Sequence, residues 1–280
     1  IAYRQVMFLK LKRLLPVLSI LGAVFLWGSS FSAVRYLLMD LTPFAVMFCR
    51  IFIAFLFIIP VSRKLWPKNY QKGDWKILVP LVLFQPCLYF LFETNALRYT
   101  TSSQAGIISA CLPLMVATAA WIFLAEKINT RTVSGLALSM AGVIMLTLFQ
   151  SEGTRASAPV LGNFLELLAM ASACGNMILV KKLSLRYDTW SLTGMQVCAG
   201  LIFFSPGAVA VLQTDISFFT PKIILMLIYL GVCVSFFSFG LYNWGISKLD
   251  ASKASIFINL IPVTAVALGW IFLGESLNLR

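Results

Sequence analysis

The sequence contains no histidine, and only 10 of its 280 residues are acidic. Histidine is the commonest metal ligand in proteins and the side chain that most readily exchanges a proton near neutral pH. The five aspartates all fall in predicted loops, at Asp40, Asp74, Asp188, Asp215 and Asp250. An enzyme embedded in a membrane would need a nucleophile, a metal cluster or an acid/base pair. The sequence therefore argues against an enzyme and predicts neither a metal nor a cofactor.

The cysteines form no CxxC pair and all fall within predicted membrane spans. They are Cys49, Cys87, Cys111, Cys174, Cys198 and Cys233. This spacing carries no signature of a disulfide framework, a redox pair or a metal site. We expect the six thiols to act as small apolar side chains in helix packing.

Charged residues make up only 11% of the chain, whereas 60% of the residues are hydrophobic and the mean hydropathy is +0.91. Soluble proteins average about 25% charged and about 45 to 50% apolar residues. The apolar runs reach the length of about 20 residues that an α-helix needs to cross a bilayer. They are continuously apolar rather than alternating, which disfavours a β-barrel. The sequence therefore predicts an all-α polytopic membrane protein.

Nine spans can be read from the apolar runs, with short polar loops between them. The predicted spans are Leu14–Val34, Thr42–Val61, Ile77–Leu97, Gln104–Leu124, Thr132–Phe149, Leu161–Val180, Ser191–Leu212, Ile223–Ile246 and Ala254–Leu273. The first span follows a basic stretch, as a signal peptide would, but no small-residue cleavage pattern comes after it. We therefore predict that it is a retained membrane helix.

Basic residues predict the orientation, because lysine and arginine resist translocation and collect in cytoplasmic loops. When the N-terminus is placed in the cytoplasm, the outer loops hold few basic residues. These are Arg35, Arg98, Arg155, Lys222 and Arg280. The net charge of +12 is then a consequence of topology, and it does not predict nucleic-acid binding.

One passage of the chain occurs twice. The stretch "PLMVATAAWIFLAEKINTR" from Pro113 reappears as "PVTAVALGWIFLGESLNLR" from Pro262, 149 residues later. Five spans precede the polar connector at residues 150–160, so the second copy must enter the membrane upside down. Inverted repeats build many secondary transporters, where they form two gates around one central site. The sequence predicts a first five-helix repeat over residues 1–149 and a second over residues 161–280.

Several passages also resemble those of a known family. The stretches are "FLWGSSFSAVRY" in the first span, "ALRYTTSSQAGIISACLPLMVATAAWIFLAEKINTRTVSGLALSMAGV", and its partial copy "SKASIFINLIPVTAVALGWIFLGE". They resemble EamA-type transporters of the drug/metabolite transporter superfamily. The resemblance implies a bundle of ten helices in two inverted five-helix repeats, in a bacterial cytoplasmic (inner) membrane. A tenth span should follow Glu275, but the sequence ends at Arg280, so we expect the printed chain to lack it.

The resemblance also implies transport of small organic metabolites, and the inverted repeat implies that transport proceeds by alternating access. Export of amino acids or related compounds is the leading expectation, and import or exchange of nucleotide-linked or phosphorylated metabolites is the alternative. The expected partners are the small-molecule substrate and the lipid bilayer. Gly135, Ser139 and Gly142 share one face of the fifth span, which packs either within one subunit or between the two subunits of a homodimer.

Pro113 and Pro262 occupy equivalent positions near the middle of the fourth and ninth spans. A proline inside a helix removes one backbone hydrogen bond and kinks the axis. Interrupted helices often mark the binding site of a transporter, so these prolines are either hinges or static kinks. Trp27, beside Gly28 in the first span, is a candidate to line a cavity.

Arg50, Glu93 and Glu166 are the charged side chains that lie clearly within predicted spans. Burying each charge costs roughly 2.5 to 3.5 kcal/mol on insertion scales, so such residues usually pair or face a cavity. The repeat offset pairs the three positions with Val197, Tyr242 and Ser19, respectively. We therefore predict that these charges contribute to the substrate site. The alternative is that the two glutamates reach the nearby headgroups.

Neutral polar residues lie on faces that the two repeats share. Gln85, Tyr89 and Glu93 follow i, i+4, i+8 spacing on one face of the third span. A shift of Tyr89 and Glu93 by the repeat offset leads to Ser238 and Tyr242 in the eighth span. Two further amides lie in the sixth and ninth spans, at Asn176 and Asn259. They contact either a substrate or a neighbouring helix.

Overall fold

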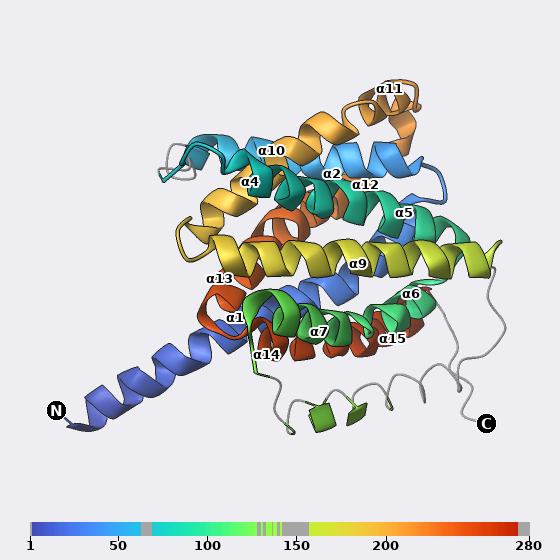
Figure 1. The fold of residues 1–280 in the computed structure, drawn as a ribbon. Helices are drawn as coiled ribbons and strands as arrows, with labels where there is room; N and C mark the ends of the chain where they lie inside the picture. The colour runs from blue at the N-terminus through green and yellow to red at the C-terminus, as the bar shows by residue number, and fades with distance from the viewer. Residues whose placement is uncertain are drawn as a thin grey trace.

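The computed structural model describes residues 2–62, 69–127 and 157–273, together with positions 130, 133–135, 137, 138 and 141. Every regular element within these residues is helical, and the helices pack into one bundle (Figure 1). Five of the described helices are long and apolar enough to cross a membrane. They are Leu14–Leu37, Trp75–Tyr99, Gln104–Leu124, Pro159–Leu183 and Pro221–Lys248. The prediction of an all-α polytopic membrane protein is therefore confirmed.

Helices of the first repeat follow the predicted spans closely. They are α1 (Ala2–Leu37), α2 (Pro43–Ile58) with η1 (Ile59–Val61), α4 (Trp75–Val82), η2 (Leu83–Leu88), α5 (Tyr89–Tyr99), α6 (Ser102–Ser109) and α7 (Leu112–Leu124). Together α4, η2 and α5 form the third span, and α6 and α7 form the fourth. The predicted fifth span, with Ser139 and Gly142, falls almost wholly outside the described residues.

The second repeat follows the same order of elements. They are α9 (Pro159–Leu183), α10 (Thr189–Phe204), α11 (Gly207–Leu212), η3 (Ile216–Phe218), α12 (Pro221–Ile228), η4 (Tyr229–Ser238), α13 (Phe239–Lys248), α14 (Ala251–Ile256), η5 (Phe257–Asn259) and α15 (Leu260–Leu273). The eighth span comprises α12, η4 and α13, and the ninth comprises α14, η5 and α15. The predicted seventh span is divided at Pro206 into α10 and α11.

Several helices begin directly after a residue whose side chain caps the first turn. The Thr42 and Thr220 hydroxyl oxygens accept hydrogen bonds from Ala45 N and Ile223 N, and a proline follows each threonine. Asp188 accepts from two backbone amides at the start of α10. Threonine and aspartate are preferred at this position because they satisfy amides that have no partner within the helix. These caps fix where the second, seventh and eighth spans begin.

The two repeats run in opposite directions. In Figure 1, α1 runs from the N-terminus on the left towards the right, whereas its counterpart α9 runs from right to left. The fourth and ninth spans are also antiparallel, because Glu126, just after α7, contacts Ala251 at the start of α14. The inverted arrangement predicted from the odd number of spans is therefore present in the described helices.

The third span of each repeat is interrupted near its middle. In η2, Gln85 has the dihedral angles of an extended residue (φ −148°, ψ 124°) and Pro86 follows it. The eighth span is π-helical over Tyr229–Ser238, which leaves some of its backbone outside the normal α-helical pattern. Such breaks are tolerated at membrane depth only where protein or a cavity surrounds them.

The fourth and ninth spans are interrupted just before the paired prolines. The helix stops at Ser109 and restarts at Leu112, one residue before Pro113. In the second repeat a 3₁₀ turn separates Ile256 from Leu260, two residues before Pro262. The proline positions therefore mark real breaks, because proline cannot donate the backbone hydrogen bond that would continue the helix.

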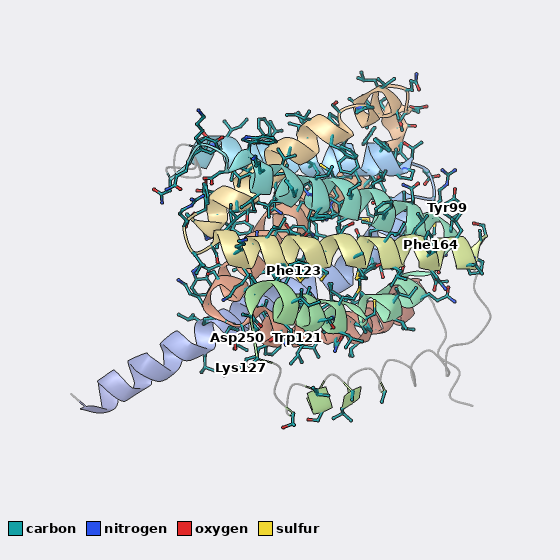
Figure 2. All side chains as sticks on the ribbon, viewed as in Figure 1. Tyr99, Trp121, Phe123, Lys127, Phe164 and Asp250 are labelled. Carbon is teal, nitrogen blue, oxygen red and sulfur yellow. The ribbon has the colours of Figure 1, made fainter. Side chains whose placement is uncertain are left out.

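Large apolar side chains on the outside of the bundle suit contact with lipid. Trp121 and Phe123, near the end of α7, are 61% and 70% exposed and lie at the surface (Figure 2). Phe25, Ile202 and Leu225 are exposed on three other helices. In water a surface of this kind would favour aggregation, whereas in hydrocarbon it is the solvated face.

A polar cluster holds the loop before α4 against the turn between α9 and α10. Asp74 forms an ion pair with Arg186 and accepts a hydrogen bond from the Tyr187 hydroxyl. Arg186 also donates to Gln71 Oε1, and Asn69 Nδ2 donates to the Arg186 carbonyl. The bonds from Tyr187 and Arg186 lower the pKa of Asp74 to about 2. The carboxylate therefore stays ionised throughout the physiological range.

Candidate functional site

The three predicted intramembrane charges lie close together in the bundle. Arg50 on α2, Glu93 on α5 and Glu166 on α9 are 1%, 4% and 0% exposed. Glu93 is near enough to both of the others to interact with them electrostatically. None of the three reaches out of the protein to lipid headgroups, so the headgroup alternative for the glutamates is wrong. Their part in substrate binding stays a prediction.

The Arg50 guanidinium contacts two neighbouring side chains, and one of its nitrogens has no hydrogen-bond partner in the described part of the chain. Its Nε donates to Ser235 Oγ in η4 at 2.7 Å, and its guanidinium carbon lies 4.4 Å from the centre of the Phe90 ring. The Nη1 atom is buried and has no hydrogen-bond partner among the described residues. A buried guanidinium with a free donor is well suited to bind a carboxylate or phosphate oxygen.

The two glutamates differ in their surroundings. Glu93 Oε1 accepts a hydrogen bond of 2.5 Å from the Tyr89 hydroxyl, one turn earlier on α5. Glu166 has both oxygens buried, and neither finds a partner in the described part of the chain. Burying an unpaired carboxylate is costly, so Glu166 requires a proton, a cation or a substrate donor. The cluster thus offers buried groups of both signs.

A chain of amides crosses the bundle beside these charges. Asn176 Nδ2 donates to Gln85 Oε1, and Gln196 Nε2 donates to Asn176 Oδ1, both at 2.7 Å. Gln196 Nε2 also donates to the Gln85 carbonyl at 3.0 Å, at the break in the third span. Asn243 Nδ2 donates to Gln196 Oε1 and to Thr193 Oγ1. The chain joins η2, α9, α10 and α13 and serves the backbone that the break leaves unsatisfied.

Sequence reasoning found Gln85 and Asn176 but missed Gln196, Asn243, Thr193 and Ser235. All four are buried polar residues within predicted spans. A polar residue in an apolar run is the sequence signal that could have identified them. The repeat offset pointed to Val197 as the counterpart of Arg50. The helix starts instead make Gln196 the counterpart, because each residue is the eighth of its helix, counted from Pro43 and from Thr189.

This corrected register shows a symmetric polar contact. Arg50 reaches Ser235 in the interrupted segment of the eighth span, and Gln196 reaches Gln85 in that of the third. Each second helix therefore bonds the break in the opposite repeat. The repeat offset predicts an apolar counterpart, Val197, for the charge of Arg50. The structure shows that polarity is conserved between the two positions and only the charge differs.

Two cavities meet at Gln85. One, of about 20 Å³, lies among α1, η2, α5, α9 and the fourth and ninth spans, and is lined in part by Trp27, Gln85, Tyr89 and Ser109. The second, of about 10 Å³, lies between α2, η2, α10 and η4. Ligand pockets usually measure about 300 to 1,000 Å³, so both cavities are too small for a metabolite in this conformation. A larger hollow of about 400 Å³ between α1, α12, η4 and α15 lies away from Gln85.

The paired prolines flank the cavity that Trp27 lines, since Leu112 and Ile261, which also line it, directly precede Pro113 and Pro262. Both prolines are buried. The structure thus brings both prolines to the cavity, and their role as hinges stays a prediction.

The remaining predicted residues are divided between the cavity and the helix packing. Trp27 lines the cavity, and its buried indole Nε1 has no partner among the described residues. Tyr242 is packed 4.9 Å from the Trp27 ring and donates to Met177 Sδ. Ser238 bonds the Val234 carbonyl of its own helix, so it contributes to the scaffold. Asn259 in η5 has no partner for either side-chain polar atom in the described residues.

Comparison with known proteins gives the class. The sequence profile of the EamA-like transporter family matches residues 14–148 and 160–280, one match in each repeat. The chain therefore belongs to the EamA-like transporter family, as its motifs predicted.

Individual relatives are similar over most of their length. An uncharacterized transporter, YcxC, of Bacillus subtilis is 29% identical over 90% of this chain and 83% of its own. An uncharacterized transporter of Archaeoglobus fulgidus is 26% identical over 90% of this chain and 86% of its own. A solved structure at 18% identity superposes with a TM-score of 0.70, over 93% of this chain and 90% of that chain. That likeness shows the fold alone.

We expect Gln196→Leu to destabilise the bundle, because it leaves Asn176 Oδ1 and the Gln85 carbonyl without their donor. Interhelical hydrogen bonds in membranes contribute roughly 0.6 to 1.7 kcal/mol each, so the loss should be of this order per bond. Thermal unfolding in detergent measures it as a lower melting temperature. The matched control is Gln213→Leu, the same change at an exposed residue. Equal melting of both variants would contradict a supporting role for the amide chain.

Proposed function

We propose that this protein is a secondary transporter, and not an enzyme, that moves small organic metabolites by alternating access, with outward transport of amino acids or related compounds as the leading case. The observation that carries the proposal is a set of buried groups of both signs beside a cavity where two inverted repeats meet. Arg50, Glu93 and Glu166 supply the charges, and Gln85 and Tyr89 line the cavity. Inverted repeats with broken helices at mid-membrane suit two exchangeable gates around one site.

An amino acid fits the cluster because it carries a carboxylate and an ammonium group. The free Nη1 of Arg50 is a donor for the carboxylate, and the oxygens of Glu166, which lack described partners, are acceptors for the ammonium group. Neutral donors and acceptors of Tyr89 and Gln85 line the space nearby. The two charges of the amino acid would then pair with Arg50 and Glu166, whose burial without a partner costs free energy.

A nucleotide-linked or phosphorylated metabolite is the second candidate, imported or exchanged. The free guanidinium donor of Arg50 favours it, because arginine binds phosphate oxygens well. Glu93 beside that arginine, and Glu166 beside Glu93, oppose a dianionic ligand, since like charges repel strongly in a medium of low dielectric constant. We therefore rank the amino-acid class first.

Neutralising either glutamate, or replacing the forked guanidinium of Arg50 by an ammonium group, should impair transport without unfolding the protein. We expect Glu93→Gln, Glu166→Gln and Arg50→Lys each to lower the uptake rate at least about tenfold, since tenfold corresponds to 1.4 kcal/mol of lost interaction. The assay is uptake by proteoliposomes of radiolabelled amino acids, tested one at a time and compared with nucleotide sugars. The matched control is Asp40→Asn, which neutralises an exposed carboxylate outside the helices. Unchanged rate, affinity and pH profile in both glutamine variants would show that the carboxylates are bystanders.

We also propose that the protein lies in a bacterial cytoplasmic membrane with its N-terminus inside. The charge bias of the loops supports this orientation. In a background without the six native cysteines, Tyr70→Cys and Ser157→Cys should label from opposite sides, because both positions are exposed and lie in loops predicted to be inside and outside. An impermeant thiol reagent applied to intact cells should modify only Ser157→Cys. Labelling of both, or of Tyr70→Cys alone, would contradict the orientation.

A further inference from the structure

The third and fourth spans of each repeat are joined by a short turn, and the two turns are equivalent. In the first repeat, Thr100 and Thr101 connect α5 to α6, and in the second, Leu249 and Asp250 connect α13 to α14. The positions differ by the repeat offset of 149 residues. Figure 1 places the two turns at opposite ends of the bundle. We call them the first turn and the second turn.

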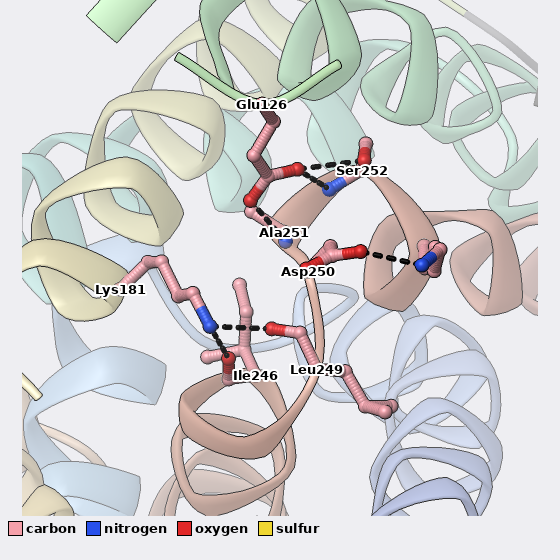
Figure 3. Close-up of polar contacts among 8 residues, drawn as sticks. Glu126, Lys181, Ile246, Leu249, Asp250, Ala251 and Ser252 are labelled. Atoms are coloured by element: carbon pink, nitrogen blue, oxygen red, sulfur yellow. Dashed lines mark hydrogen bonds and ion pairs between the residues drawn. The ribbon is translucent and has the colours of Figure 1, made fainter. Parts of the chain in front are cut away.

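Lys181 of α9 holds the second turn. Its Nζ donates to the Leu249 carbonyl at 2.6 Å and to the Ile246 carbonyl at 3.1 Å (Figure 3). These carbonyls end α13, where the helix leaves its last acceptors unsatisfied and carries a partial negative charge. A lysine at this position therefore binds both the free acceptors and the helix dipole.

Arg35 of α1 makes the same contact with the first turn. Its Nη1 donates to the Thr100 carbonyl and, at 3.4 Å, to the Leu97 carbonyl. Leu97 and Thr100 precede Ile246 and Leu249 by 149 residues each, and α1 is the counterpart of α9. The same cation contact thus occurs at both ends of the molecule. An offset of 147 residues would pair Arg35 with Lys182, but the contact is made by its neighbour Lys181.

Further bonds fasten the fourth-span side of each turn. Glu126 accepts hydrogen bonds from Ala251 N at 2.7 Å, from Ser252 N at 3.1 Å and from Ser252 Oγ at 2.7 Å (Figure 3). A carboxylate is favourable there because the first amides of a helix are free donors. At the first turn, Thr100 Oγ1 lies 2.9 Å from Asn163 Oδ1 of α9. Each turn is therefore bound to helices outside its own helical hairpin.

We infer that Arg35 and Lys181 are gate clamps, positioning residues that hold the two ends closed and release in alternation. The inference rests on the proposed function. The fourth and ninth spans both line the small cavity beside Gln85, which must widen and open at one end to admit a solute, and movement of either span would open it. The helix of each of these two spans is broken one or two residues before its proline. The turn that precedes the span attaches one end of it to the rest of the bundle. Breaking one clamp frees the outer part of that helix to swing about the break.

Two equivalent alanines report the opening of each end. Ala105 on α6 and Ala254 on α14 are both 0% exposed and lie one turn inside the first and second turns. Each is replaced by cysteine in a background without the native cysteines, and the rate of reaction with a polar thiol reagent is measured in detergent, without substrate. The clamp variants are Arg35→Met and Lys181→Met. The matched controls are Arg98→Met and Lys182→Met, which remove exposed cations close to each clamp.

We expect Lys181→Met to raise the labelling rate of Ala254→Cys at least about tenfold, the change in population that follows the loss of one hydrogen bond to a charged group. The same variant should lower the labelling rate of Ala105→Cys. Arg35→Met should have the opposite effect on both reporters, and the controls should change neither. Reciprocal changes are required because the two ends open in alternation.

A higher labelling rate only at the cysteine next to the altered clamp, or at both cysteines, would overturn the inference. The two cations would then be local helix caps. Unchanged labelling would overturn it as well. Labelling needs no substrate, so its outcome is separate from that of the transport assay. Reciprocal labelling in a protein that moves no solute would retain the clamps and refute the transport function. Transport without reciprocal labelling would do the reverse.

Discussion

Hydrocarbon provides no hydrogen-bond partner, so the protein must satisfy every backbone polar group of a spanning helix. The third span violates the regular pattern at Gln85, in the middle of the bundle, and the rest of the site is arranged around that violation. Gln196 donates to the Gln85 carbonyl that the break leaves without a helical partner. It also donates to Asn176 and accepts from Asn243. Both cavities meet at Gln85. One break in a helix therefore determines where polar side chains and empty space can exist inside the membrane.

The inverted repeat supplies each of these features twice. Arg50 and Gln196, at equivalent positions, each reach the interrupted third span of the opposite repeat. Arg35 and Lys181 likewise bind equivalent helix ends at opposite sides of the bundle. The symmetry is kept in the scaffold contacts, whereas the charges of Glu93 and Glu166 have no charged counterpart. A symmetric frame with an asymmetric site is what a transporter with two equivalent gates and one substrate requires.

Much of this could be predicted from the sequence, because hydropathy and the repeat are strong signals. The boundaries of the described spans agreed with the helices to within a few residues except at the start of α1, which begins at Ala2 and not at Leu14, and the paired prolines marked the breaks before Pro113 and Pro262. The buried charges were also found, since an ionisable residue in an apolar run is conspicuous. Gln196 was missed because the same repeat offset was applied to every helix. The second helix of each repeat, α2 and α10, is related by a slightly shorter offset. Pro86 favours an extended residue before it and so gives a local reason for the break at Gln85, but no local pattern predicts the bond that Gln196 makes to it.

Counterflow tests the central claim, that one buried site faces each side of the membrane in turn. Proteoliposomes are preloaded with an unlabelled amino acid, and a trace of the same radiolabelled amino acid is added outside. The account predicts a transient accumulation above the equilibrium level that saturates with concentration, because the loaded site returns carrying unlabelled solute. Entry that is linear in concentration and never exceeds equilibrium, across the amino acids and nucleotide sugars tested, would contradict it.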